Sequence, residues 1–258
     1  MNTMIANFRR FKPLLGELVA RDVKTKYRRS VLGVMWTVLN PLLMMVVLSI
    51  VFSQIFKFDI DNYPLYLLSG QVVFNFFSSS TTMSMNAIIE NAPLIKKVYV
   101  PKYMFVLSRT VSSTINLMAS FAALLIVMMC TRAELYYTTV LSIFPIACLV
   151  VFSFGVGLIL AAFAVKFRDI VHLYSVFITA LMYLTPVIYP MSSLPVWVKR
   201  IVLINPITSM LEMFRGFMIY GTMPGLFTTL MTVIPSIVFL AIGFRVFYRN
   251  QDNFILYV

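Results

Sequence analysis

The chain has 258 residues, of which 60% are hydrophobic and 12% charged, and its formal net charge at pH 7 is +12. Soluble domains carry about 25% charged residues, so this composition excludes an ordinary soluble globular protein. The cations cluster at the ends of long apolar runs, where Lys and Arg set orientation in a membrane and meet anionic lipid headgroups. This distribution indicates an integral membrane protein and argues against nucleic acid as a partner.

The segment 8–29 repeats apolar residues at helical spacing and places basic residues on the other side. This pattern predicts an amphipathic helix that lies on the cytosolic membrane surface. The run from Val31 to Phe56, which follows directly, contains no charged residue. We therefore expect the surface helix to lead straight into the first membrane span.

Hydropathy and length predict an all-α protein with six spans. The second span, 64–85, is rich in Ser, Thr, Asn and Gln, which favours contact with protein or a water-filled path over contact with lipid. The predicted spans are 31–56, 64–85, 105–129, 138–163, 170–190 and 225–247, within a single domain of residues 1–258.

The segment 192–222 lies between the last two predicted spans and consists of two apolar halves separated by Asn205-Pro206. The residue before a proline disfavours helix, and each half is too short to cross a bilayer. We therefore expect a re-entrant helical hairpin.

Orientation follows from the distribution of Lys and Arg. Fifteen of the 21 lie in the N-terminal segment, in 86–102, in 164–169 and at the C-terminal end, against five on the opposite side. The positive-inside rule then predicts that both termini are cytosolic.

Signatures of catalysis are absent from the sequence. It contains no GxxxxGK[ST] phosphate-binding loop, no HExxH and no pair of carboxylates within a span. The single histidine, His172, favours a structural role, and Cys130 and Cys148 predict neither a disulfide framework nor a metal site. We expect no enzymatic activity, no metal and no cofactor in this chain.

Arg109 falls inside the predicted span 105–129. Two interpretations are open. Arg109 contacts an anionic substrate, or its side chain snorkels to the cytosolic lipid headgroups. Its position about two turns from the membrane edge favours snorkelling.

Aromatic residues crowd the outer halves of three predicted spans. They form an interfacial belt or stack on sugar rings along a substrate path, and the sequence alone favours the belt. The candidates for the path are Phe52, Phe56, Tyr63, Tyr66, Phe74, Phe76, Phe77, Tyr183 and Tyr189.

The cytosolic loop 86–98 combines apolar and charged residues. A short helix that offers a mixed face to a partner explains these apolar residues better than a plain connector does. The candidate contact residues are Glu90, Leu94, Ile95, Lys96 and Lys97.

Four segments carry a family resemblance. They are "RDVKTKYRRSVLGVMWTVLNPL" (21–42), "LIKKVYVPK" (94–102), "KFRDIVHLYSVFITALMYLTPVIYP" (166–190) and "LPVWVKRIVLINPITSMLEMFR" (194–215). In this order they resemble the membrane subunit, or permease, of type-2 ABC exporters, in the branch that exports O-antigen, capsule or teichoic-acid-like polysaccharide. The most specific features are the basic patch beside Leu32, Gly33 and Trp36, and the LPxW…NP…R spacing.

The resemblance implies a pore made by two copies of the chain, with two separate ABC ATPase subunits that bind ATP and Mg²⁺. Segment 86–98 would be the coupling helix, 192–222 the outer gate, and the aromatic residues would line the path of a lipid-linked polysaccharide through the bacterial cytoplasmic (inner) membrane. The gate residues would be Trp197, Asn205, Pro206, Glu212 and Arg215.

Other functions remain open. The permease of a small-molecule or drug ABC exporter has a similar sequence. A membrane-embedded glycosyl- or acyltransferase would need acids or histidines that converge at one membrane face, and none do. An ion channel would need a filter-like loop or a ring of charge.

Overall fold

The computed structural model describes residues 2–27, 30–56 and 60–254, and within these ranges the side chains of 2–9, 27 and 53–56 are not described. The described chain is helical and contains no strand, so the predicted all-α fold is confirmed. The helices are α1 (Asn2–Tyr27), α2 (Trp36–Phe56), α3 (Tyr63–Glu90), α4 (Ala92–Ile95), α5 (Tyr103–Cys130), α6 (Ile143–Lys166), α7 (Ile170–Tyr183), α8 (Val196–Ile204), α9 (Pro206–Met218) and α10 (Leu226–Asn250). Short 3₁₀ turns occupy Gly33–Met35, Tyr137–Ser142, Met191–Ser193 and Gln251–Asn253.

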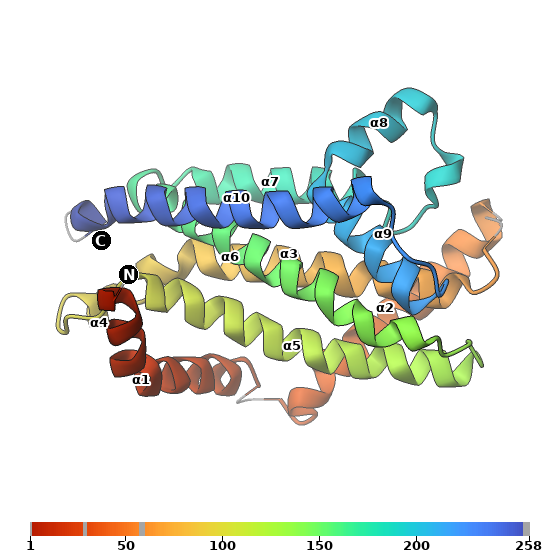
Figure 1. The fold of residues 1–258 in the computed structure, drawn as a ribbon. Helices are drawn as coiled ribbons and strands as arrows, with labels where there is room; N and C mark the ends of the chain where they lie inside the picture. Colours follow the sequence, from red (N-terminus) through yellow and green to blue (C-terminus); the bar gives the residue numbers. More distant parts are fainter. Residues whose placement is uncertain (1, 28–29, 57–59, 255–258) are drawn as a thin grey trace.

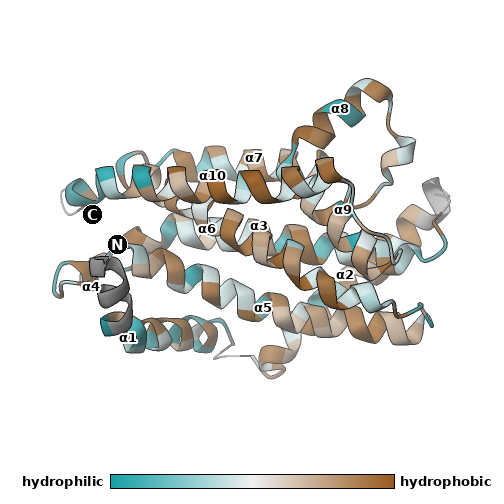
Figure 2. Ribbon diagram, viewed as in Figure 1, coloured by the Kyte–Doolittle hydropathy of each residue, from teal (hydrophilic) through white to brown (hydrophobic). Residues whose placement is uncertain are grey.

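The long helices lie side by side in a bundle with two distinct ends (Figure 1). One end holds both chain termini together with α4 and part of α1, and we call it the terminal end. The opposite end, which we call the far end, holds α8, the end of α2 and the start of α3. Hydrophilic residues gather at the terminal end, whereas the middle of the bundle is mostly hydrophobic (Figure 2).

Helix α3 is the centre of the bundle. It packs against α5 and α6, and most of its residues are buried. This position explains why a span rich in Ser, Thr, Asn and Gln is tolerated, because hydroxyl groups in a buried helix bond back to their own helix. Thr81, for example, donates to the Phe77 carbonyl at 2.7 Å. The expectation that this span contacts protein is confirmed.

Helices α6 and α10 pack backbone to backbone through two glycines. A Cβ atom added at Gly155 would lie 2.6 Å from the backbone of Phe239 and Leu240, and one added at Gly243 would collide with the Gly155 carbonyl. Small residues at helix crossings allow this close approach in membrane proteins. The pair therefore fixes how α10 lies against the core.

The span count agrees only partly with the sequence prediction. Among the described residues, four segments are long and apolar enough to cross a membrane: Gly33–Phe52, Tyr103–Cys130, Tyr137–Lys166 and Leu226–Asn253. Helix α3 is long but less apolar, and the 14 residues of α7 cover about 21 Å at 1.5 Å per residue. The number six therefore stays a prediction.

Two predicted helices differ in extent from the observed ones. Helix α7 ends at Tyr183, short of the predicted residue 190, and Pro186 and Pro190 in the segment that follows cannot donate the next helical hydrogen bonds. The predicted helix 86–98 is divided, because α3 continues to Glu90 and a single turn, α4, follows Asn91.

The predicted break in 192–222 is confirmed. Helices α8 and α9 meet at Asn205 with a bend of 93°. The Asn205 side chain accepts a hydrogen bond from the backbone N–H of Ile207 at 3.1 Å, which caps α9, and Pro206 occupies its first position.

Candidate functional site

A buried arginine organises the far end of the bundle. Arg215 on α9 has no exposed surface. Its Nη1 donates to the Pro186 carbonyl at 2.7 Å, and its Nη2 donates to the carbonyls of Val187 at 3.1 Å and Tyr66 at 3.0 Å. Its Nε donates to the Ser69 hydroxyl at 3.1 Å. The guanidinium thus joins α9, α3 and the irregular segment after α7.

The charge of Arg215 has one carboxylate nearby. Its Nη1 lies 3.6 Å from the Glu212 carboxylate, one turn earlier on α9. The Arg215 guanidinium also packs closely against Gly70, since a Cβ atom added at Gly70 would lie 2.7 Å from Arg215 Nη2. Arg215 is therefore a second charge held within the bundle, besides Arg109. The sequence predicted that Arg215 belongs to the hairpin but did not predict that it is buried.

The aromatic residues proposed for a sugar path fall into two groups. Tyr63 and Tyr66 on α3 are buried, and their hydroxyls donate to the backbone carbonyls of Ile188 and Tyr189, each at 2.9 Å. Phe74, Phe76 and Phe77 are buried in the same core, where Phe77 stacks on Phe152.

The second group is more accessible. Tyr183 is 67% exposed, and Tyr189 and Phe52 are half-buried. The Tyr189 hydroxyl donates to the Tyr183 carbonyl at 2.6 Å. The side chain of Phe56 lies outside the described residues. Tyr183 is thus the candidate whose aromatic ring is most available to a ligand in a single copy of the chain.

The two halves of the proposed gate differ in burial. Trp197 on α8 is 68% exposed, whereas most residues of α9 are buried. Besides capping α9, Asn205 donates through Nδ2 to the Thr185 hydroxyl at 2.9 Å. The hairpin is therefore fastened to the segment after α7 at its bend as well as through Arg215.

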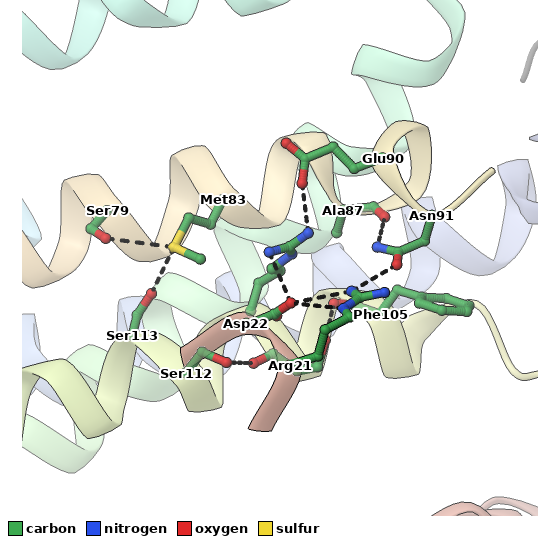
Figure 3. Close-up of polar contacts among 12 residues, drawn as sticks. Arg21, Asp22, Ser79, Met83, Ala87, Glu90, Asn91, Phe105, Ser112 and Ser113 are labelled. Carbon is green, nitrogen blue, oxygen red and sulfur yellow. Dashed lines mark hydrogen bonds and ion pairs between the residues drawn. The ribbon is translucent and has the colours of Figure 1, made fainter. Parts of the chain in front are cut away.

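A second ionic network lies at the terminal end (Figure 3). Arg109 on α5 contacts Asp22 of α1 at 3.2 Å and Glu90 of α3 at 2.6 Å. Arg21 donates to Asn91 at 2.9 Å, and Asn91 donates to the Ala87 carbonyl at 2.7 Å. The snorkelling interpretation of Arg109 is wrong, because its guanidinium ties α1 to the ends of α3 and α5.

The candidate coupling residues occupy this terminal end. Lys96 and Lys97 are exposed, and the side chain of Glu90 is 53% exposed although it contacts Arg109. Leu94 and Ile95 are half-buried and pack against a core that includes Leu18 of α1. The charged candidate coupling residues are thus more accessible to a partner than the apolar ones are.

The C-terminal end of α10 is fastened to the same region. The Lys102 ammonium donates to the Gln251 carbonyl and lies over the Phe254 ring, 5.6 Å from its centroid. Burial lowers the pKa of Lys102, and the nearby Asp252 opposes that shift. Lys102 was counted only as a positive charge in the sequence, and nothing in its spacing indicated this contact.

No group of three or more His, Cys, Asp or Glu side chains able to hold a metal ion occurs among the described residues. The partly or fully buried cations Lys102, Arg109 and Arg215 instead pair with carboxylates or with backbone carbonyls. The arrangement offers polar surfaces for binding and for contact with a partner.

Comparison with known proteins adds the family. A family model described as ABC-2 type transporter matches residues 13–219. The O-antigen export system permease protein RfbA of Myxococcus xanthus is 29% identical over 258 residues, which cover 98% of each chain. The protein of that name from Klebsiella pneumoniae is 27% identical over 93% of each chain. The polysialic acid transport protein KpsM of Escherichia coli is 24% identical over 81% of this chain and 80% of its own.

Proposed function

The chain belongs to the ABC-2 type transporter family, and from that membership we propose that it is the permease subunit of an ATP-driven exporter of lipid-linked polysaccharide. The observation that carries the proposal is the similarity to O-antigen export permeases over more than nine tenths of both chains. The polysialic acid transport protein KpsM extends the similarity to the transporter of another polymer. O-antigen, capsule and teichoic-acid-like polymers are the substrate classes that fit.

ATP hydrolysis belongs, in this proposal, to a separate ATPase. The sequence has no phosphate-binding loop, and the terminal end presents the exposed cations of the α4 turn, Lys96 and Lys97. Two ATPase subunits, which bind ATP and Mg²⁺, would contact this end in each complex. Two copies of the permease would enclose the pore, because the bundle of a single chain is filled at its centre by α3.

The terminal end faces the cytosol in this proposal. Both termini, α4 and part of α1 lie together there (Figure 1), and this is the end at which most Lys and Arg of the sequence gather, as the positive-inside rule requires. The α8–α9 hairpin then lies at the outer face of the inner membrane, where it would gate the exit of the polymer.

Gene deletion and complementation test the proposal. We expect a strain without this gene to lose surface polysaccharide and to accumulate lipid-linked polymer on the cytosolic side, and we expect the wild-type gene to restore display. Purification of the tagged chain should yield a complex with an ABC ATPase, whereas the chain alone should not hydrolyse ATP.

Two outcomes would contradict the proposal. Unchanged surface polysaccharide in the deletion strain, together with greater sensitivity to small toxic compounds, would favour the drug-exporter alternative. Sugar or acyl transfer by the purified chain alone would favour the transferase alternative.

A further inference from the structure

A cavity of about 880 Å³ opens within a single copy of the chain, between α2, α3 and α5. Its lining is rich in uncharged polar side chains. They include Asn40 of α2, Asn75, Ser79 and Thr82 of α3, and Asn116 of α5, with Trp36 at the start of α2. The polar residues named here have no role in the site described above, although one candidate path aromatic, Phe76, also lines this cavity.

A second cavity, of about 470 Å³, continues the first toward the terminal end. Lys26, Met83 and Asn116 line both. Figure 3 shows Met83 at this junction, where its sulfur accepts weak hydrogen bonds from Ser79 of α3 and Ser113 of α5 at 3.8 and 3.6 Å. We call the two cavities together the inner groove.

The inner groove reaches from the ionic network to the middle of the bundle. Glu90 lines its terminal end and Asn75 its deep end, and the helical rise places these two residues of α3 about 22 Å apart. The amide of Asn75 is exposed although it lies near the middle of a 28-residue helix. An exposed amide at this depth is unfavourable against lipid, so the groove suits water or another polar occupant.

Two buried atoms at the terminal end of the groove lack a partner. Among the described residues, neither Oδ2 of Asp22 nor Nε of Arg109 has a hydrogen-bond partner, and these side chains are only 3% and 12% exposed. The first atom is an acceptor and the second carries a donor. Both atoms have almost no accessible surface, so a small shift of the two side chains would let a ligand hydroxyl donate to the carboxylate and accept from the guanidinium.

The charge of the lining agrees with a hydroxyl-rich ligand that also bears phosphate. Arg21, Lys26 and Arg109 outnumber Asp22 and Glu90 at the terminal end, and Arg and Lys are the usual partners of phosphate. Farther in, amides, hydroxyls and the partly exposed indole of Trp36 suit a sugar ring, which combines hydroxyls with an apolar face.

We propose that the inner groove of each copy is a cytosol-facing binding site for the carbohydrate next to the phosphate of the lipid-linked polymer. This inference rests on the proposed function and adds to it a site within one chain, apart from any pore between two copies. The groove would hold the sugars near the carrier before they enter the pore.

Thiol labelling in cells tests whether the groove is occupied. Ser79→Cys places a thiol of nearly the same size in the groove, in a chain whose two native cysteines are replaced by Ser. Thr114→Cys, on α5 but outside the groove lining, is the matched control. Each variant is exposed to N-ethylmaleimide in cells that make the polymer and in cells whose polymer assembly is blocked at its first step.

We expect Ser79→Cys to react in polymer-free cells and to be protected about tenfold in producing cells, as for a site about 90% occupied. Equal reaction in both strains would mean that no polymer enters, and would overturn the proposal. No reaction in either strain would mean that a second copy or lipid fills the groove, and would overturn it as well. Thr114→Cys should remain unreactive throughout.

Export measurements separate this site from the proposed function. The variant Asn75→Leu/Thr82→Val keeps the volume of the lining and removes its polar groups. We expect about a tenfold loss of export at normal membrane abundance, as removal of one or two hydrogen bonds to the ligand predicts. Thr114→Val should export normally. If deletion of the gene abolishes surface display of the polysaccharide but the groove variant exports normally, the groove site is refuted and the proposed function stands. If surface display survives the deletion, the proposed function itself is refuted.

Discussion

The guanidinium of Arg215 lies on the ring of Tyr66, with its Cζ 3.5 Å from the ring centroid, and its Nη2 also donates to the backbone carbonyl of that same residue. One side chain of α9 therefore contacts both the ring and the backbone of α3. Its other donors reach the segment that follows α7. This single cation therefore joins three segments of the chain, in addition to the hydrogen bonds of Asn205, Tyr63 and Tyr66.

Replacement of Arg215 by Lys should destabilise the protein although the charge is kept. A lysine ammonium has neither the planar fork nor the stacking surface of a guanidinium. We expect a loss of about 3 kcal/mol, because each buried carbonyl left without its donor costs about 1–3 kcal/mol. Thermal unfolding of the purified protein in detergent measures the effect. Arg200→Lys, on the exposed face of α8, is the control, and equal midpoints for the two variants would contradict the prediction.

Asp22→Asn should loosen α1 from the bundle. The substitution keeps the shape of the side chain but removes the more deeply buried of the two anions that contact Arg109. We expect a loss of about 2 kcal/mol, less than for a fully buried pair, because Glu90 still contacts Arg109. Faster protease cleavage within α1 would report it, with Glu17→Gln as the exposed control.

A double-mutant cycle sharpens that test. Asp22→Asn in an Arg109→Gln background should cost less than in the wild-type background, because the cation that needs the anion is then missing. Equal costs in the two backgrounds would show that the two side chains do not interact energetically.

Lys96→Glu/Lys97→Glu should uncouple the ATPase while the permease still inserts. Both side chains are exposed at the terminal end, and misplaced charges at an interface can cost about 2–5 kcal/mol when the contact is buried. We expect normal membrane abundance, weaker ATPase association and loss of surface polysaccharide. Lys199→Glu/Arg200→Glu, at the far end, is the matched control. If Lys96→Glu/Lys97→Glu exports at the wild-type level, Lys96 and Lys97 do not couple the permease to the ATPase.

Tyr183→Leu tests the sugar path with the least disturbance of folding. Its ring is 67% exposed, so leucine keeps apolar area and removes the flat π face together with the hydroxyl. We expect reduced export at unchanged stability, whereas Tyr137→Leu, a similarly exposed tyrosine of the loop before α6, should export normally. If both variants export normally, Tyr183 belongs to an interfacial belt.

Gly243→Ala should disturb the packing of α10. The added methyl group would collide with the Gly155 carbonyl, a backbone atom that cannot rotate away. We expect a loss of about 2 kcal/mol, typical of overpacking, seen as a lower unfolding midpoint. Gly16→Ala adds the same methyl group to α1 where no atom lies within 4 Å, so it should be neutral or slightly stabilising.

The helices could be predicted from the sequence because their signals are local. Long uncharged runs mark α5, α6 and α10, and the pair Asn205-Pro206 marks the bend between α8 and α9. The early end of α7 was missed although Pro186 and Pro190 were visible, because apolar composition alone extended the predicted span. In that segment the prolines lack the backbone N–H groups that would continue the helix, and this effect outweighed the apolar composition.

The contacts of the charged residues could not be predicted, because they join distant parts of the chain. Arg109 was interpreted from its depth in one helix, yet its partners Asp22 and Glu90 come from two other helices. Arg215 likewise depends on α3 and on the segment after α7. The inner groove had a partial signal in the polar composition of α3, but its walls are set by how α2 and α5 pack against it.

The hydrogen bonds of Arg215 also impose an order on biosynthesis. All of its acceptors, in Tyr66, Ser69, Pro186 and Val187, leave the ribosome before the arginine itself. A central arginine costs about 2.5–3.5 kcal/mol at the translocon, and α9 has only 13 residues to offset it. Any insertion of α9 next to the bilayer would therefore be assisted by acceptors that the earlier part of the chain already carries. A chain that ends before residue 215 leaves the carbonyls of Tyr66, Pro186 and Val187 without the arginine donors that they have in the finished fold.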